Sequence, residues 1–149
     1  MKTNLINENF TSDYVANLLK ARGVENVEDY FNPTEKYLQS PDALKNIRLA
    51  AALYMRIVNN GGRILIVVDS DNDGYTSAAI IYQYTVRMNP NCKVDYWLHE
   101  GKQHGLQDHI DKLMEDNCEY DLIILPDSSS NDAHYHDMLD TIGTPCLIL

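Results

Sequence analysis

The chemically richest segment of this sequence is an acidic turn with three carboxylates at alternate positions. Asp69, Asp71 and Asp73 lie in the segment DSDNDG, which directly follows the apolar run RILIVV. Carboxylates crowded in this way repel one another unless they are hydrated or share a cation. Ligation by oxygen alone favours Mg²⁺, Ca²⁺ or Mn²⁺ over Zn²⁺. The turn is therefore a candidate site for a hard divalent cation.

Three interpretations of the acidic turn compete. An EF-hand loop begins in the same way, but its twelfth position would be Ile80 instead of a bidentate Glu, and a strand precedes the turn where an EF-hand has a helix. A polar turn from a strand into a helix is the second interpretation, and one capping Asp would suffice for it. A metal-dependent phosphoryl-transfer site is the third, and it uses all three carboxylates. We reject the first and favour the third.

A further carboxylate, Asp127, follows a second apolar run, DLIILP. Taken alone, an Asp in this place is more typical of a turn or a helix cap. The carboxyl ends of parallel strands open on the same edge of a sheet, however, so Asp127 can approach Asp71 and Asp73 there. This alignment adds Asp127 to the candidate metal ligands.

The pattern after Gly62 predicts an α/β fold, a parallel sheet flanked by helices. Short apolar runs alternate with stretches of helical periodicity, which is typical of parallel strands joined by right-handed crossovers. The expected strands are 63–68, 94–98, 121–125 and 146–149, and the expected helices are 75–87, 107–117 and 131–141.

Residues 1–61 are expected to form an N-terminal helical extension, and residues 62–149 the sheet domain. One helix should follow the capping residues 11–13 and end at Gly23, and a second should begin at Ser40. Residues 24–39 between them read as an irregular connector.

Composition and charge exclude several classes of protein. The 149 residues are 44% hydrophobic and 23% charged, an ordinary globular balance. No apolar run approaches the ~20 residues of a membrane span, and the N-terminus lacks a signal-peptide pattern, so we predict a cytoplasmic protein with no membrane partner. The net charge of −10 arises in residues 61–149, which hold 15 acidic and 5 basic side chains. This excess argues against a general nucleic-acid-binding patch on this part of the protein.

The cysteines do not predict a disulfide framework or a zinc site. The sequence has three of them, Cys92, Cys118 and Cys146, and they are widely spaced. We expect them to be small buried side chains.

The stretch from Leu18 to Ile80 resembles the N-terminal part of RecJ-type single-strand-specific exonucleases of the DHH phosphoesterase superfamily. The matching segments are LLKARGV, a connector with FNP, and SPDALKNIRLAAALYMRIVNNGGRILIVVDSDNDGYTSAAI. The first motif of that family, D-x-D-x-D-G-x-T-S after a strand, reads DSDNDGYTS in this chain. Its second motif is an Asp after a later strand, which matches Asp127. The resemblance implies a hydrolase of single-stranded DNA, with a place in DNA repair and recombination.

The same resemblance implies a site for two divalent cations, Mn²⁺ or Mg²⁺, which activate a water and neutralise charge on a phosphodiester. Asp71, Asp73 and Asp127 match catalytic metal ligands of the family, with Asp69 as a further ligand or a hydrogen-bond partner. Ser77 matches the Ser of the first motif, either supporting the ligands or only starting the helix.

The family's Asp-His-His motif should follow a strand like CLIL, where this chain ends at Leu149. We therefore expect the chain to be the N-terminal portion of a longer enzyme, inactive or nearly so by itself. Single-stranded nucleic acid would be held mainly by the later part. The loop HEGKQHGL stands where the family has a Gly-Tyr-Gly-Leu loop, and its Lys102 and His104 are candidates for contact with substrate phosphate or simply exposed loop residues.

Two alternatives for function and two for metal ligation accompany this interpretation. The function alternatives are a DHH-type phosphodiesterase or oligoribonuclease for short or cyclic nucleotides, and a non-catalytic interaction module. A zincin motif at His99-Glu100 fails because its second His would stand at Gln103. Asp132, His134, His136 and Asp137 offer a small metal cluster, against which we favour a solvated polar helix start.

Overall fold

The computed structural model describes residues 14–101, 103–115 and 119–149. The chain divides into two compact units, Met1–Leu44 and Lys45–Leu149. The second unit contains every strand found among the described residues and the acidic turn, and it is the unit that positions the candidate site.

The second unit is built on four parallel strands in the order β2-β1-β3-β4. Their bounds are β1 Arg63–Val68, β2 Lys93–Leu98, β3 Leu122–Leu125 and β4 Cys146–Ile148. Strand β1 pairs with β2 on one side and with β3 on the other, with Ile66 opposite both Tyr96 and Ile124. The predicted α/β fold with a parallel sheet is confirmed, and each predicted strand lies within one residue of its observed bounds at either end.

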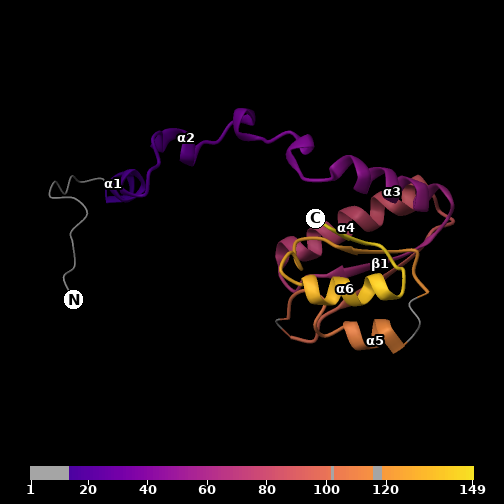
Figure 1. Cartoon of the computed structure of the whole chain (residues 1–149). Coiled ribbons are helices and arrows are strands. Elements are labelled where there is room, and N and C mark those ends of the chain that lie inside the picture. The colour runs from indigo at the N-terminus through magenta and orange to yellow at the C-terminus, as the bar shows by residue number, and fades with distance from the viewer. Residues whose placement is uncertain (1–13, 102, 116–118) are drawn as a thin grey trace, which may run out of the picture. The chain divides into compact units, whose positions relative to one another are not determined.

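Helices cover both faces of the sheet because β1 and β3 are apolar on both faces. On one face Ile64 and Ile66 pack against α3 (Ile47–Asn59) and α4 (Asn72–Met88). On the other face Leu65 and Val67 pack beneath α5 (Ile110–Glu115) and α6 (Ala133–Thr141). Figure 1 shows this arrangement, with α4 on one side of β1 and α5 and α6 on the other. The result is a layered α/β unit with its core in the two central strands.

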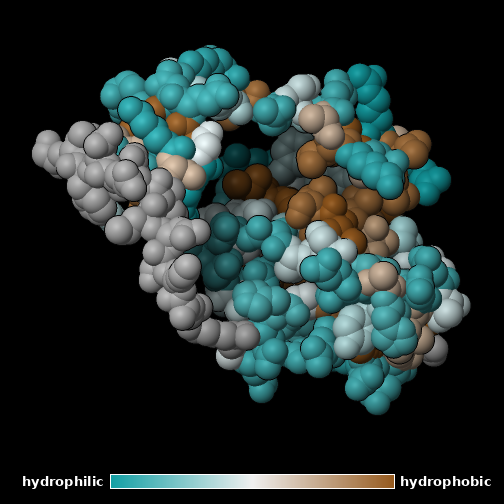
Figure 2. Space-filling model, turned by 60° about the vertical axis from the view of Figure 1, so that its left-hand side comes forward, coloured by the Kyte–Doolittle hydropathy of each residue, from teal (hydrophilic) through white to brown (hydrophobic). Residues whose placement is uncertain are grey.

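Hydrophobic side chains also remain on the surface of this unit. Leu49 is 73% exposed, Ile80 is 68% exposed and Leu149 is 52% exposed. Figure 2 shows hydrophobic residues gathered in brown beside hydrophilic ones on one face of the molecule. Within the described residues, no helix has the length and apolar character that crossing a membrane requires.

Helix α3 begins later than the sequence predicted. Ser40 does cap a helical turn, with its hydroxyl accepting from the amide of Asp42, but that turn is a short 3₁₀ helix, η2 (Pro41–Ala43). The α-helix starts only after Asn46, whose positive φ of 62° is incompatible with a continuous right-handed helix through this residue. Since the buried Ile57 and Val58 of α3 pack on the sheet core, the compact unit begins at Lys45, before the boundary expected at residue 62.

The first unit is more helical than its sequence suggested. Helix α1 (Tyr14–Ala21) is where a helix was predicted, although its expected capping residues 11–13 lie outside the described residues. The expected irregular connector contains a short helix, α2 (Val27–Phe31), and a 3₁₀ turn, η1 (Glu35–Tyr37). The sequence pattern missed these two elements because side-chain hydrogen bonds, rather than apolar periodicity, hold them. Asn26 caps α2, and Lys36 and Tyr37 both donate to the Asp29 carboxylate.

Two of the cysteines pack at the edges of the core, as small apolar side chains do. Cys92 contacts the α3 side and Cys146 the α5 and α6 side, and both are free thiols. Burial raises the pKa of the Cys146 thiol to about 12. Cys118 lies outside the described residues.

Candidate metal centre

The acidic turn joins the end of β1 to the start of α4, which begins at Asn72, three residues before the predicted start. Asp71 is the N-cap residue, and its carboxylate accepts a hydrogen bond from the amide of Gly74 at 3.0 Å. The Ser77 hydroxyl donates to the Gly74 carbonyl at 3.0 Å, so Ser77 bonds to the first turn of its own helix. The carboxylate that caps the helix therefore also extends α4 back into the acidic segment.

Gly74 allows the helix to lie directly against the end of β1. A Cβ atom on Gly74 would lie 2.5 Å from the Cβ of Asp69 and 2.6 Å from its carbonyl oxygen. Such distances are far shorter than van der Waals contact, so any larger residue would push strand and helix apart. Asp69 is consequently fixed in place and buried, with 3% of its surface exposed.

The carboxylates of Asp71 and Asp73 influence one another directly. The hydrogen bond from the Gly74 amide, followed by one from Asp73, holds the pKa of Asp71 below its ordinary value. The pKa of Asp73 is raised, chiefly by the hydrogen bond that it shares with Asp71 and also by the negative charge of Asp127. This pair gathers negative charge at one edge of the sheet, where a cation would relieve the repulsion.

Asp127 reaches the cluster from the neighbouring strand. It follows β3, which lies beside β1 in the sheet, and its amide donates to the carbonyl of Leu149 at the end of β4. Its φ of 71° is the left-handed conformation that non-glycine residues seldom adopt. Oxygens of Asp69, Asp71 and Asp127 all lie within 4.8 Å of one another.

The structure thus brings together the carboxylates that the sequence predicted at one edge of the sheet. The donor set fits a hard divalent cation, because every donor is a carboxylate oxygen and two of the three residues are exposed. Asp73 is outside this group of three and contacts it through Asp71. Metal ligation by these four residues stays a prediction.

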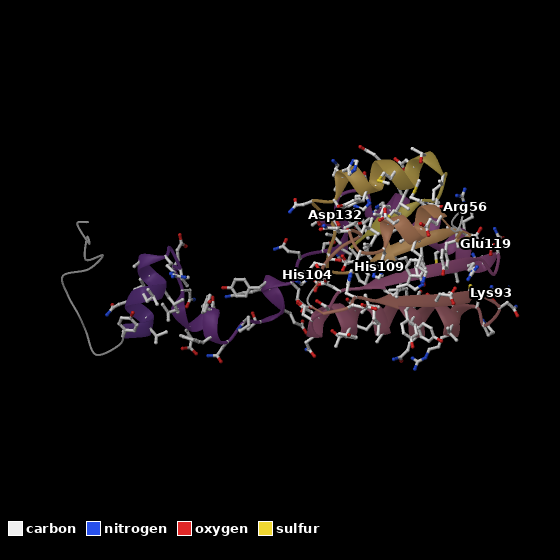
Figure 3. The ribbon with its side chains drawn as sticks, turned by 90° about the horizontal axis from the view of Figure 1, so that it is seen from below. Arg56, Lys93, His104, His109, Glu119 and Asp132 are labelled. Atoms are coloured by element: carbon white, nitrogen blue, oxygen red, sulfur yellow. The ribbon has the colours of Figure 1, made fainter. Side chains whose placement is uncertain are left out.

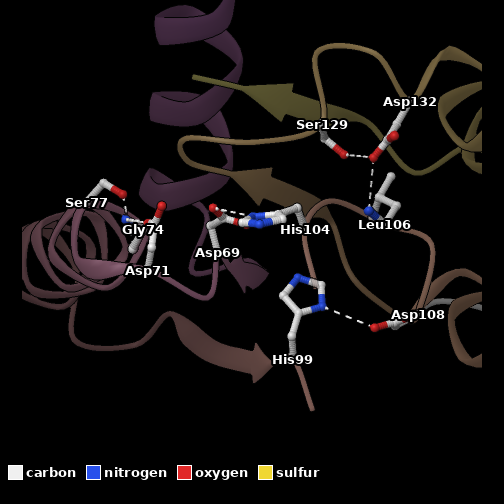
Figure 4. A network of polar contacts seen from close by, with 10 residues as sticks. All are labelled: Asp69, Asp71, Gly74, Ser77, His99, His104, Leu106, Asp108, Ser129 and Asp132. Carbon is white, nitrogen blue, oxygen red and sulfur yellow. Dashed lines mark hydrogen bonds and ion pairs between the residues drawn. The ribbon is translucent and has the colours of Figure 1, made fainter. Parts of the chain in front are cut away.

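His104 approaches the cluster from the loop after β2. Its Nδ1 lies 2.8 Å and 2.9 Å from the two carboxylate oxygens of Asp69. The imidazole is 62% exposed, while the Asp69 side chain is 4% exposed. The buried carboxylate therefore orients an exposed imidazole beside the candidate metal ligands (Figure 4). Lys102, the other predicted substrate contact, lies outside the described residues.

A second set of contacts, which sequence reasoning missed, joins the loops that carry His104 and Asp127. The Asp132 carboxylate accepts hydrogen bonds from the amide of Leu106 at 3.0 Å and from the hydroxyl of Ser129. The only local signal in the sequence was the glycine at position 105, a residue type that permits a positive φ. In the structure the φ of Gly105 is 75°. Nothing in the spacing of Leu106 and Asp132, which are 26 residues apart, pointed to this bond.

The alternative metal cluster around Asp132 is not formed in the described part of the chain. There, Asp69, Asp71 and Asp127 are the only group of three or more potential ligands close enough to hold an ion. His136 instead places its Nε2 3.0 Å from the carbonyl oxygen of Ser129. Asp132 and His136 thus bond to groups of the protein, and α6 begins directly after Asp132.

The candidate centre occupies one end of the sheet unit. In Figure 3, His104 and Asp132 lie at that end, and Arg56, Lys93 and Glu119 lie at the other. At the opposite end Arg63 forms ion pairs with Asp95 at 2.9 Å and Glu119 at 3.1 Å. The carboxylates of Asp95 and Glu119 are thus neutralised by the Arg63 guanidinium, whereas the candidate centre brings carboxylates together.

Comparison with known proteins shows similarity over the whole chain to two related proteins. Over 150 aligned residues it is 34% identical to YorK, a SPbeta prophage-derived protein of Bacillus subtilis (strain 168) that is provisionally named a single-strand DNA-specific exonuclease. A protein of Bacillus phage SPbeta with a corresponding name is equally similar. The chain spans 25% of the length of each. No family model matches the chain, and no solved structure does.

Proposed function

We propose that this chain supplies the first carboxylate ligands of a metal-dependent nuclease that hydrolyses phosphodiester bonds of single-stranded DNA. The observation that carries the proposal is the approach of Asp69, Asp71 and Asp127, from two neighbouring strand ends, to within 4.8 Å of one another. Similarity over the whole chain to proteins named as single-strand DNA-specific exonucleases supports it. The resemblance to the DHH phosphoesterases points to Asp71, Asp73 and Asp127 as ligands, and to Asp69 as a further ligand or a hydrogen-bond partner.

Each residue of the cluster has a definable part in this proposal. Asp71 and Asp127 present exposed carboxylates to a cation, and Asp73 adds negative charge beside them. Mn²⁺ or Mg²⁺ held there would supply positive charge for the oxygens of a phosphodiester. Buried Asp69 binds the His104 imidazole through Nδ1, which leaves Nε2 to meet a phosphodiester. Nε2 accepts a hydrogen bond in the neutral ring and donates one to a phosphate oxygen in the protonated ring.

The electrostatics of the unit agree with this assignment of roles. Residues 61–149 carry 15 acidic and 5 basic side chains, so a polyanion is repelled until cations occupy the carboxylate edge. Contacts to the rest of the single-stranded DNA would come from other parts of a longer protein. This chain spans only 25% of the length of each relative. We therefore propose that this chain contributes the cation site rather than the strand-binding surface.

Calorimetric titration of Mn²⁺ tests the proposal directly. The wild-type chain should bind Mn²⁺, and Asp71→Asn/Asp73→Asn should lose that binding while remaining folded by circular dichroism. Asp127→Asn should weaken it, because Asp127 supplies an oxygen from the second strand. Asp111→Asn removes one carboxylate from the exposed surface of α5 and serves as the control, with unchanged binding expected.

Absence of Mn²⁺ and Mg²⁺ binding to the wild-type chain would refute the assignment of the cation site to this chain. Equal weakening by Asp111→Asn and Asp127→Asn would show nonspecific attraction to an acidic protein instead. Joined to the remaining sequence of a relative such as YorK, the chain should support cation-dependent degradation of single-stranded DNA, which Asp71→Asn/Asp73→Asn should abolish.

A further inference from the structure

Asp132 stands at the start of α6, but its side chain does not cap that helix. An Asp at this position ordinarily accepts a hydrogen bond from an amide two or three residues later. Here no such bond forms to any described residue of α6. Its Oδ2 accepts instead from the amide of Leu106 at 3.0 Å and from the hydroxyl of Ser129. One carboxylate oxygen thus joins the loop after β2 to the loop after β3 (Figure 4).

Each of these two loops carries a member of the candidate centre. Leu106 follows His104 by two residues, and Ser129 follows Asp127 by two residues. Asp127 and Ser129 have positive φ values of 71° and 74°. Non-glycine residues keep such a conformation only where surrounding contacts hold it. The bond from Ser129 to Asp132 is one contact of this kind.

The packing around Asp132 reserves space for these bonds. A Cβ atom on Gly105 would collide with the Asp132 carboxylate and would lie 3.1 Å from the Ser129 hydroxyl oxygen. Leu106 is fully buried in the core between the sheet, α5 and α6. Its amide therefore has little access to water as an alternative partner, which makes the Asp132 oxygen its acceptor.

We propose that Asp132 is a positioning residue, which fixes His104 and Asp127 relative to each other by binding both of their loops. The consequence for cation affinity rests on the proposed function, whereas the positioning itself does not. Residues that orient metal ligands without touching the metal typically contribute about 10- to 100-fold to affinity. The geometry assigns that part to Asp132.

The test compares Asp132→Ala and Asp132→Asn with Asp137→Ala, an exposed carboxylate of the same helix. Two measurements without metal report on positioning: amide hydrogen exchange of Asp127 and the imidazole resonances of His104. Asp132→Ala should speed the exchange of Asp127 by at least about tenfold and shift the His104 resonances, while the Gly74 amide in the acidic turn stays unchanged. Asp132→Asn keeps an acceptor oxygen and should restore most of both signals, and Asp137→Ala should match the wild type.

A third measurement, Mn²⁺ affinity, connects the positioning to the site. We expect Asp132→Ala to weaken it about tenfold. If Asp132→Ala does not fold, Ser129→Ala, which removes a single bond, should give a smaller change of the same sign. Wild-type values for Asp127 exchange and His104 resonances in Asp132→Ala would overturn the proposal, and so would failure of Asp132→Asn to restore them. Should the wild-type chain not bind Mn²⁺, the proposed function fails, and the two metal-free measurements still decide the role of Asp132.

Discussion

On one side of the carboxylate cluster, Asp69 to Gly74 form a continuous turn, held by a bond between residues three positions apart. On the other side, His104 is bonded to a residue 35 positions away and Leu106 to one 26 positions away. The first side is a local structure that its own residues specify. The second exists only when three loops of the folded sheet are together, so the two sides should respond differently to the same perturbation.

The largest expected effect is on the side held by distant contacts. Leu106→Ala removes a fully buried side chain from the core beneath α5 and α6 and should lower the free energy of unfolding by about 2–5 kcal/mol. Urea denaturation measures this loss, with Leu98→Ala, at 47% exposure in β2, as the control. The His104 imidazole resonances should shift while the Gly74 amide keeps its wild-type position. Equal disturbance of both would show that the two sides are a single cooperative unit.

Gly74→Ala is the complementary perturbation, because it acts on the local side of the cluster. The added methyl group meets Asp69 at 2.5 Å, and relief of that clash should cost about 1–3 kcal/mol. Because the clash moves Asp69, Mn²⁺ affinity should fall as well. Thr76→Ala, an exposed change in the same turn, should stay within about 0.5 kcal/mol of the wild type. Wild-type stability and Mn²⁺ affinity in Gly74→Ala would mean that the strand and helix need not lie so close.

The smallest expected effect is a pH dependence of folding stability that arises on the side held by distant contacts. Burial, together with the nearby His99, lowers the pKa of His109 below 6.5, its ordinary value. The folded protein thus resists protonation of a group that the unfolded chain protonates readily. The stability contributed by neutral His109 is complete above pH 6.5 and is lost as the pH falls below it.

Thermal unfolding at pH 7.5 and pH 5.5 measures this contribution. His109→Phe keeps a ring against Trp97, whose centroid lies 5.5 Å from that of His109, and it removes the titrating group. On acidification the wild type should lose more stability than His109→Phe, but by less than about 1 kcal/mol, because His109 is only partly buried and water screens its charge. An identical loss in both proteins would exclude His109 as the source.

The sequence by itself determined the sheet and the local side of the candidate centre. Strands such as RILIVV and DLIIL are continuous apolar runs that can only be buried between two layers of helices, and their alternation with helical periodicity fixed a parallel arrangement. The acidic turn was readable because alternate carboxylates, Gly74 and the preceding strand are adjacent in the chain. Parallel topology also brought Asp127 to the same edge, because both strands end there.

Only the tertiary structure decided how the other side is held. The pairing of His104 with Asp69, and the use of Asp132 to bind Leu106 and Ser129, depend on loop paths that span tens of residues. The same limit explains the start of α3 at Ile47 and the short helix α2, since Asn46 takes a left-handed conformation and Asp29 gathers donors from residues beyond its own helix. Periodicity and capping rules describe contacts within a few positions of the chain. Contacts between distant loops form only where the packed core has already placed their backbones within hydrogen-bonding distance.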